Sequence, residues 1–248
     1  MSQFRRMGKN LLGYARSILP PAPGAVVLTY HSVSDDNRSF TTVPYQIFVE
    51  QLMQLRNCGY QFTSLTSVCN AISGHENLPK KTVAVTFDDA YEDFYQAVFP
   101  LLVSMDIPAT VFVPTAFVGK TKQTSDGYRM QTMNWDQLRE VTSSQLITIG
   151  SHTVSHTSLR NLSDKELKKE LEDSRTELES NLGIVCDMFA YPKGKHDSRA
   201  IAAVSQVYLY SFSTEPARVT KNADKNLIPR KGIFRYTRKG ELLGMVRR

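Results

Sequence analysis

Short, almost wholly apolar runs recur along this chain and alternate with stretches of helical periodicity. The apolar runs cover residues 25–30, 82–87, 109–113, 147–150, 188–191 and 207–212. Strands that are apolar on both faces are typical of a parallel sheet with helices packed outside it. About six to eight such strands in one unit favour a single α/β domain in the form of a barrel over two small domains.

Helices are expected at residues 47–55, 91–105, 135–141, 163–182 and 198–204. Pro100 should bend or interrupt the second of these, because proline removes a backbone donor. The fourth is the clearest: Ser163 and Glu166 form a capping-box pattern at its start, and Gly183 follows its end. Residues 117–133 are polar, and we expect a long loop there on the rim of a groove.

The charge of the chain is concentrated at its ends. The net charge is +6, of which residues 1–20 contribute +4 and residues 218–248 contribute +8, so the middle carries −6. An enzyme acting on nucleic acid more often has positive charge around its site, and we therefore expect no nucleic-acid partner. Basic ends suit an anionic membrane surface or a phosphorylated partner, although they would equally serve solubility.

Prolines and a glycine at positions 20–24 separate a basic N-terminal tail, residues 1–20, from a folded body, residues 21–248. Residues 4–19 are compatible with a short amphipathic helix lying on a membrane. We find neither a signal-peptide pattern nor the run of about 18 apolar residues that a transmembrane helix needs. The expected location is the cytoplasm, peripheral to the inner membrane face, with export as the rival. Three widely spaced cysteines indicate free thiols and no disulfide framework.

Four polar clusters directly follow predicted strands, at residues 30–31, 88–89, 151–156 and 192–194. The carboxyl ends of parallel strands meet at one face of a barrel, where its chemistry is normally located. His152 and His156 are four residues apart, and one helical turn would bring both imidazoles to the same side. Together with one carboxylate they would make a metal site with open positions for water and substrate. Histidines that only cap a helix or fill the core are the structural alternative.

Asp88 and Asp89 are adjacent, so we expect their roles to differ. One would ligate the metal, and the other would take a proton from water activated by that metal. His31 is the candidate to protonate a leaving group, with a structural histidine beside Tyr30 as the alternative. His75 and His196 are in polar contexts and are expected at the surface.

Three segments together resemble the polysaccharide deacetylases of carbohydrate esterase family 4. They are residues 86–90 (Thr-Phe-Asp-Asp-Ala), 151–156 (Ser-His-Thr-Val-Ser-His) and 189–194 (Phe-Ala-Tyr-Pro-Lys-Gly). The resemblance covers roughly residues 25–235. It implies a distorted (β/α)7 barrel, and hydrolysis of N-acetyl, sometimes O-acetyl, groups on sugars. It also implies one divalent metal ion, Zn2+ first, with Co2+, Ni2+ or Mn2+ as alternatives.

The resemblance also implies site residues. Asp88 corresponds to the catalytic base, and Asp89, His152 and His156 correspond to the metal ligands. Residues 28–33 (Leu-Thr-Tyr-His-Ser-Val) resemble a circularly permuted branch that includes poly-N-acetylglucosamine deacetylases. In that branch an N-terminal histidine is the catalytic acid, a role that falls here on His31.

The third segment departs from the family pattern, which usually has arginine two residues before the proline and tyrosine after it. This chain has Ala190 and Lys193 there. The backbone N–H of Lys193 can still stabilise an oxyanion, because that role needs no particular side chain. Arg230 is our candidate to replace the missing arginine by reaching Asp88, and a surface arginine is the alternative.

The expected function is that of a metal-dependent sugar de-N-acetylase. Its expected substrate is an N-acetylated sugar, an oligosaccharide, or a sugar linked to a lipid or nucleotide. The alternatives are an O-acetyl esterase or non-sugar amide hydrolase on the same fold, and a non-catalytic carbohydrate-binding protein. The aromatic candidates for stacking on sugar rings are Tyr30, Tyr91, Tyr128 and Trp135, and packing in the core or at the rim is the structural alternative for each of them.

Overall fold

One parallel sheet organises the computed structural model, which describes residues 22–247. The strands follow the order β11-β10-β9-β6-β5-β1-β12, and the short β4 also pairs with β5. The predicted N-terminal tail lies outside the described residues. The strands are β1 (Val26–Tyr30), β4 (Gln61–Phe62), β5 (Thr82–Asp88), β6 (Ala109–Val113), β9 (Ile147–Ser151), β10 (Met188–Ala190), β11 (Tyr210–Phe212) and β12 (Lys231–Gly232).

The segment 226–232 brings the two edges of this sheet together. Ile228 pairs in parallel with Phe212 of β11. A few residues later β12 pairs in parallel with β1, with Thr29 opposite Gly232. The same short segment therefore contacts both edge strands, and the sheet curls into a distorted barrel. The predicted single α/β domain with a barrel-like parallel sheet is confirmed.

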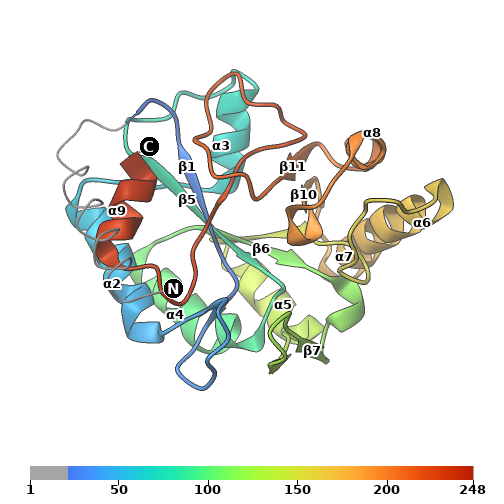
Figure 1. Cartoon of the computed structure of the whole chain (residues 1–248), viewed down its shortest axis with the longest axis horizontal. Coiled ribbons are helices and arrows are strands. Elements are labelled where there is room, and N and C mark those ends of the chain that lie inside the picture. Colours follow the sequence, from blue (N-terminus) through green and yellow to red (C-terminus); the bar gives the residue numbers. More distant parts are fainter. Residues whose placement is uncertain (1–21, 248) are drawn as a thin grey trace.

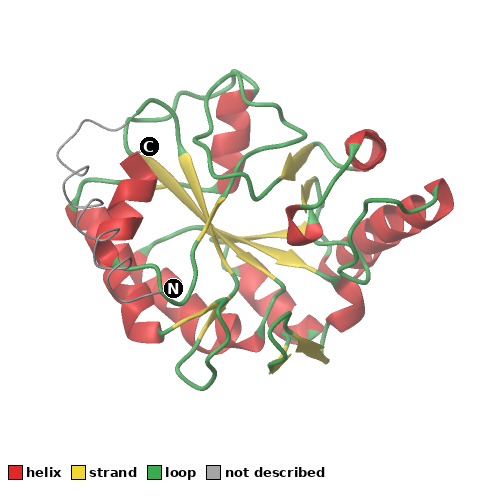
Figure 2. Cartoon of the chain, in the orientation of Figure 1, coloured by secondary structure: helices red, strands yellow, loops and turns green. Residues whose placement is uncertain are grey.

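Helices surround the strands on the outside (Figures 1 and 2). Their inner faces carry buried apolar side chains, such as Phe48 and Leu52 of α2 and Leu138 of α5, which pack on the sheet. Within residues 22–247 no helix combines the length and apolar character that a membrane span requires. The helices are α2 (Tyr45–Asn57), α3 (Leu65–Ile72), α4 (Phe99–Met105), α5 (Trp135–Ser143), α6 (Asp164–Lys168), α7 (Ser174–Leu182), α8 (Ser198–Val207) and α9 (Lys239–Arg247).

The predicted helix over residues 163–182 forms with the expected ends and an unexpected middle. Ser163 and Glu166 make the capping box, and Gly183 ends the helix with φ of 66°. Between α6 and α7, Lys169–Asp173 form a π-helical turn. A second π turn, Phe94–Val98, lies directly before Pro100 in α4. A wider turn there accommodates a proline that has no N–H to donate to the preceding turn.

Two sequence expectations about local structure are wrong. Val207 does not begin a strand; it ends α8, and the N–H of Tyr208 still bonds to the carbonyl of Val204 at 2.8 Å. Residues 117–133 are not a plain loop, because they contain the antiparallel hairpin β7 (Thr121–Gln123) and β8 (Arg129–Gln131). A second small pair, β2 (Ser32–Val33) and β3 (Thr42–Val43), was also not predicted.

Candidate functional site

All four predicted polar clusters lie at the carboxyl end of the barrel. Asp88 is the last residue of β5, and Asp89 follows it with φ of 75°. His31 follows β1, His152 follows β9, and Pro192 lies two residues beyond β10. The parallel arrangement of the strands is what gathers these residues, as the sequence predicted.

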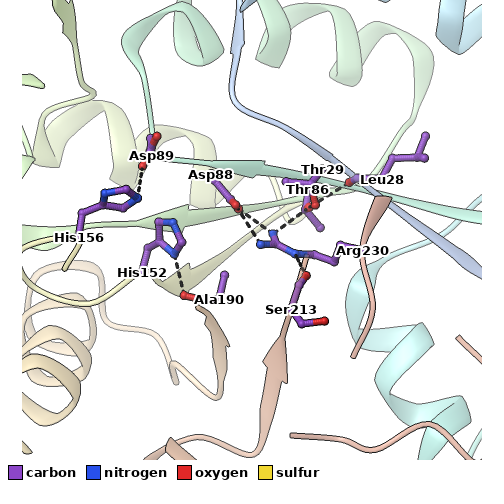
Figure 3. Close-up of polar contacts among 10 residues, drawn as sticks. All are labelled: Leu28, Thr29, Thr86, Asp88, Asp89, His152, His156, Ala190, Ser213 and Arg230. Carbon is purple, nitrogen blue, oxygen red and sulfur yellow. Dashed lines mark hydrogen bonds and ion pairs between the residues drawn. The ribbon is translucent and has the colours of Figure 1, made fainter. Parts of the chain in front are cut away.

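Asp89, His152 and His156 form a compact cluster of potential metal ligands. One ligand atom from each residue lies within 4.8 Å of the others. The Nε2 atom of His156 is 3.2 Å from Oδ1 of Asp89 (Figure 3). Ligand atoms on a tetrahedral ion with bonds of about 2.0–2.1 Å lie about 3.3 Å apart, so this spacing fits a divalent metal.

The two histidines approach each other by a different route from the predicted helical turn. Residues 152–156 are a loop, not a helix, and Thr153 and His156 have φ of 67° and 57°. The imidazole centroids are nevertheless 4.8 Å apart. The proximity expected from the spacing is present, but left-handed backbone produces it.

The protonation states of the cluster also suit metal binding. Burial lowers the pKa of His156 to about 3, and burial also lowers the pKa of His152 although Asp88 and Asp89 oppose it. Burial alone would raise the pKa of Asp89, but His156 and Lys122 outweigh it and hold this pKa below its ordinary value. Two neutral imidazoles and one carboxylate are therefore available as ligands.

A backbone contact orients one of the imidazoles. The carbonyl oxygen of Ala190 lies 2.7 Å from Nδ1 of His152 (Figure 3). With Nδ1 donating its proton to this carbonyl, Nε2 is left as the atom available to a metal. Oδ1 of Asp89 is buried and accepts no hydrogen bond within the described residues, and its polar neighbours are Nε2 of His156 at 3.2 Å and Nζ of Lys122 at 3.1 Å.

Arg230 forms a bidentate ion pair with Asp88 inside the barrel. Its Nη1 and Nη2 atoms donate to Oδ1 and Oδ2 of Asp88 at 2.7 and 2.9 Å (Figure 3). The Arg230 side chain is completely buried, and its guanidinium also lies 5.0 Å from the ring centroid of Phe112. This contact is the one expected from the sequence.

The ion pair controls the charge of Asp88. Burial alone would raise the pKa of this carboxyl, but the positive charge and the hydrogen bonds of Arg230 outweigh burial. The pKa of Asp88 is thus held below its ordinary value. The carboxylate is ionised at neutral pH, next to the ligand cluster but not part of it.

Lys122 is a residue of this site that sequence reasoning missed. It extends from the hairpin β7–β8, is only 5% exposed, and places Nζ 3.1 Å from Oδ1 of Asp89. A single lysine in a polar stretch gives no sequence signal, and only the pairing of the hairpin directs it inward.

The remaining predicted site residues lie at the same end. Lys193 is exposed and has φ of 59° in a tight turn, Pro192–Gly194. Gly194 is required there, because a Cβ atom would lie 1.9 Å from Oγ1 of Thr214. His31 is half-buried, and its Nδ1 makes no hydrogen bond to the described residues.

Two of the four aromatic candidates for sugar stacking are wrong. Tyr30 is fully buried and donates to Gln51 at 3.0 Å. Tyr91 is 2% exposed and donates to Asp89 at 3.1 Å. For these two rings the alternative of packing in the core holds. Tyr128 is exposed, and Trp135 is half-buried against the apolar core.

The architecture and the site define an α/β-barrel protein with a two-histidine, one-carboxylate centre and a neighbouring buried carboxylate. Residues 75–211 match the family described as polysaccharide deacetylase. That span is more than half of the chain, and the chain belongs to the polysaccharide deacetylase family.

Relatives and solved structures agree with this assignment. The poly-beta-1,6-N-acetyl-D-glucosamine N-deacetylase of Escherichia coli K12 is 37% identical over 142 residues, which are 54% of this chain. The matched stretch is only 21% of that relative's length. The Streptococcus pyogenes deacetylase PplD in complex with acetate is 26% identical, with a TM-score of 0.76 over 91% of this chain and 99% of that one. IcaB from Ammonifex degensii is 25% identical, with a TM-score of 0.79 over 92% and 99%.

Proposed function

We propose that this protein removes acetyl groups from the amino sugars of an N-acetylated glycan, with a poly-N-acetylglucosamine polymer as the preferred substrate. Membership of the polysaccharide deacetylase family and the printed names of its relatives support this proposal. The observation that carries it is the buried Asp88–Arg230 pair beside Asp89, His152 and His156. These groups together provide a base and a metal site at the carboxyl end of the barrel.

Asp89, His152 and His156 would hold one divalent ion, which when bound polarises the acetyl carbonyl and makes water more acidic. That acidification matters because Asp88, with its lowered pKa, is a weak base toward ordinary water. We assign Asp88 to accept the proton as water attacks the carbonyl carbon. Arg230 keeps this carboxylate ionised and fixed in orientation.

Two further groups complete the proposed reaction. The backbone N–H of Lys193 donates to the oxyanion that develops on the acetyl oxygen. His31 gives a proton to the departing sugar amine, so that the C–N bond breaks and acetate leaves. Each proton transfer of this kind contributes about 10²–10⁴-fold to a rate.

Acetate release tests this function. The purified chain would be supplied with β-1,6-linked N-acetylglucosamine oligomers, nucleotide-linked and lipid-linked N-acetylhexosamines, and O-acetylated sugars, each with and without a chelator. We expect chelator-sensitive release from the N-acetylated oligomers. Release from O-acetylated sugars alone would make the protein an esterase, and binding of glycans without release would make it a carbohydrate-binding protein.

A further inference from the structure

Two phenylalanines on the rim of the barrel are exposed and stacked on each other. Phe40 is 43% and Phe234 is 40% exposed, and their ring centroids are 5.8 Å apart with an interplanar angle of 31°. A single exposed aromatic side chain needs no explanation, but two rings in contact make a continuous apolar surface. We call Phe40 and Phe234 the rim pair.

The rim pair lies at the same end of the barrel as the proposed catalytic acid, His31. Strands β1 and β12 pair in parallel with Thr29 opposite Gly232, and the N–H of Ile233 bonds to the carbonyl of Thr29 at 2.8 Å. His31 and Phe234 each follow this pair by two residues, just beyond the ends of β1 and β12. Both segments therefore leave the sheet at the carboxyl end of the barrel, where the site is located.

Phe234 is held in place although it is exposed. Its ring lies directly over Gly232, where a Cβ atom would come within 2.7 Å of the ring. The N–H of Phe234 donates to Oγ1 of Thr237 at 3.1 Å, and the N–H of Thr237 returns a bond to the carbonyl of Phe234 at 2.8 Å. The turn between Phe234 and Thr237 thus holds the Phe234 ring against the backbone of Gly232, which has no side chain.

Phe40 is fixed from two sides. Its N–H donates to Oδ2 of Asp126 in the turn between β7 and β8 at 2.9 Å, and its carbonyl accepts the N–H of Arg235 at 2.9 Å. The Arg235 guanidinium also donates to the carbonyl of Asn37 at 2.9 Å. The loop that follows His31, the segment that follows Arg230 and the hairpin carrying Lys122 are therefore joined into one rim.

We propose that the rim pair is a stacking platform for the sugar unit next to the one that loses its acetyl group, so that the protein selects polymeric over monomeric substrate. This inference rests on the proposed function. The face of a pyranose ring presents C–H groups, and the face of an aromatic ring is electronegative and apolar, so the two stack favourably. Because both rings are already ordered, little conformational entropy is lost when a sugar binds.

The experiment compares Phe40→Ala, Phe234→Ala and the double variant with the wild-type protein on β-1,6-linked N-acetylglucosamine dimers and hexamers. We expect the ratio of kcat/KM for the hexamer to kcat/KM for the dimer to fall by about 5- to 10-fold in the double variant. Phe234→Tyr should recover most of this ratio. Leu209→Ala is the matched control, because Leu209 is 49% exposed at the amino end of β11, away from the site.

Binding without turnover separates failure of this inference from failure of the proposed function. Calorimetric titration of the hexamer into Asp88→Asn, with and without the two alanine substitutions, should show weaker binding when the rim pair is removed. Equal binding, or an unchanged ratio in an active double variant, would overturn the platform. If no acetate is released from any oligomer, the proposed function fails, and the titration still decides about the platform.

A lipid surface is the other occupant that exposed phenylalanines could serve. Sedimentation with phosphatidylglycerol vesicles distinguishes it from a glycan. If the double variant loses vesicle binding while its hexamer-to-dimer ratio stays at the wild-type value, the rim pair contacts lipid and the inference is wrong. We expect instead that the substitutions leave vesicle sedimentation at the level of Leu209→Ala.

Discussion

Asp88 and Arg230 are both withdrawn from water, and this makes their ion pair costly to break from one side. Replacing only one partner leaves an uncompensated buried charge. Arg230→Met should therefore lower the free energy of unfolding by about 3–5 kcal/mol, as measured by urea denaturation. The double variant Asp88→Asn/Arg230→Met removes the orphaned charge and should recover part of that loss. A double variant no more stable than Arg230→Met would contradict this explanation.

A second prediction for single residues follows because the proposed base, Asp88, is not one of the proposed metal ligands. Asp88→Asn keeps the shape of the side chain but removes its ability to accept a proton. Acetate release should fall by about 10²–10⁴-fold. Metal affinity, measured by calorimetry, should stay close to that of the wild type, whereas Asp89→Ala should lose it. Wild-type turnover by Asp88→Asn would refute the assignment.

The residues of the site differ in how far their positions could be predicted from the sequence. The Asp-Asp doublet and the paired histidines stand directly behind apolar strands, so their convergence follows from topology. Arg230 could be proposed as the partner of Asp88 only because Ala190 stands where the family usually has an arginine. Lys122 and the rim pair had no such signal, because their positions depend on hydrogen bonds between loops. The sequence left open whether Tyr30 and Tyr91 stack on a sugar or pack in the core, because the burial of an aromatic side chain near a strand end depends on the layer packed against it.

Among the elements, the turn Pro192–Gly194 is proposed to act through its backbone. If the N–H of Lys193 is the oxyanion donor, the lysine side chain should matter little. Lys193→Ala should keep acetate release within about twofold of the wild type, whereas Gly194→Ala should lower kcat by about 10-fold or more. The reason is the positive φ of Gly194 together with its close approach to Thr214. Equal effects of both substitutions would place the donor elsewhere.

The junction between β2 and the π turn Phe94–Val98 carries a pH-dependent contribution to stability. Ser32 donates a hydrogen bond to Asp93, and burial raises the pKa of Asp93 to about 7. The unfolded chain releases this proton near its ordinary pKa of 3.8. Between about pH 4 and pH 7 the folded state thus binds the extra proton, and stability falls as pH rises, by at most about 1.4 kcal/mol per pH unit.

Asp93→Asn tests this linkage. The variant should lack the decline, so that it gains stability relative to the wild type between pH 5 and pH 8. Urea unfolding of both proteins across that range measures the difference between their free energies of unfolding. Groups that titrate in the same way in both proteins do not contribute to this difference. A constant difference across the range would contradict the raised pKa.

Periodic elements were predicted well, and irregular ones were not. The central strands and the capping box at Ser163 follow from apolar runs and local hydrogen-bond patterns. The π turns and the hairpin β7–β8 arise where a proline or tertiary contacts override local preference. The loop geometry of His152 and His156 belongs to this second kind, because its positive φ angles are set by the surrounding site.

For the molecule as a whole, a metal ion that binds at Asp89, His152 and His156 should raise the stability of the folded state. A metal that binds only the folded state at 100 times its Kd adds about 2.7 kcal/mol. For a protein of this size that corresponds to a Tm about 5–10 °C higher with metal than with a chelator. Thermal melts followed by circular dichroism measure the shift. Asp89→Ala should show none, and an equal shift in that variant would place the binding elsewhere.

The whole-molecule expectations have different outcomes. The barrel and the family are established, while the membrane contact of the basic ends stays a prediction, since residues 1–20 lie outside the described part of the chain. The choice of a cytoplasmic or exported location also stays a prediction.

Strand β12 pairs with β1 although it comes much later in the sequence. Asp89, His152 and His156 are therefore synthesised well before Arg230. A nascent chain arrested short of Arg230 would hold all three proposed metal ligands but leave the proposed base, Asp88, without its guanidinium partner. The proposed hydrolysis thus requires a segment that is synthesised after all three residues of the proposed metal site.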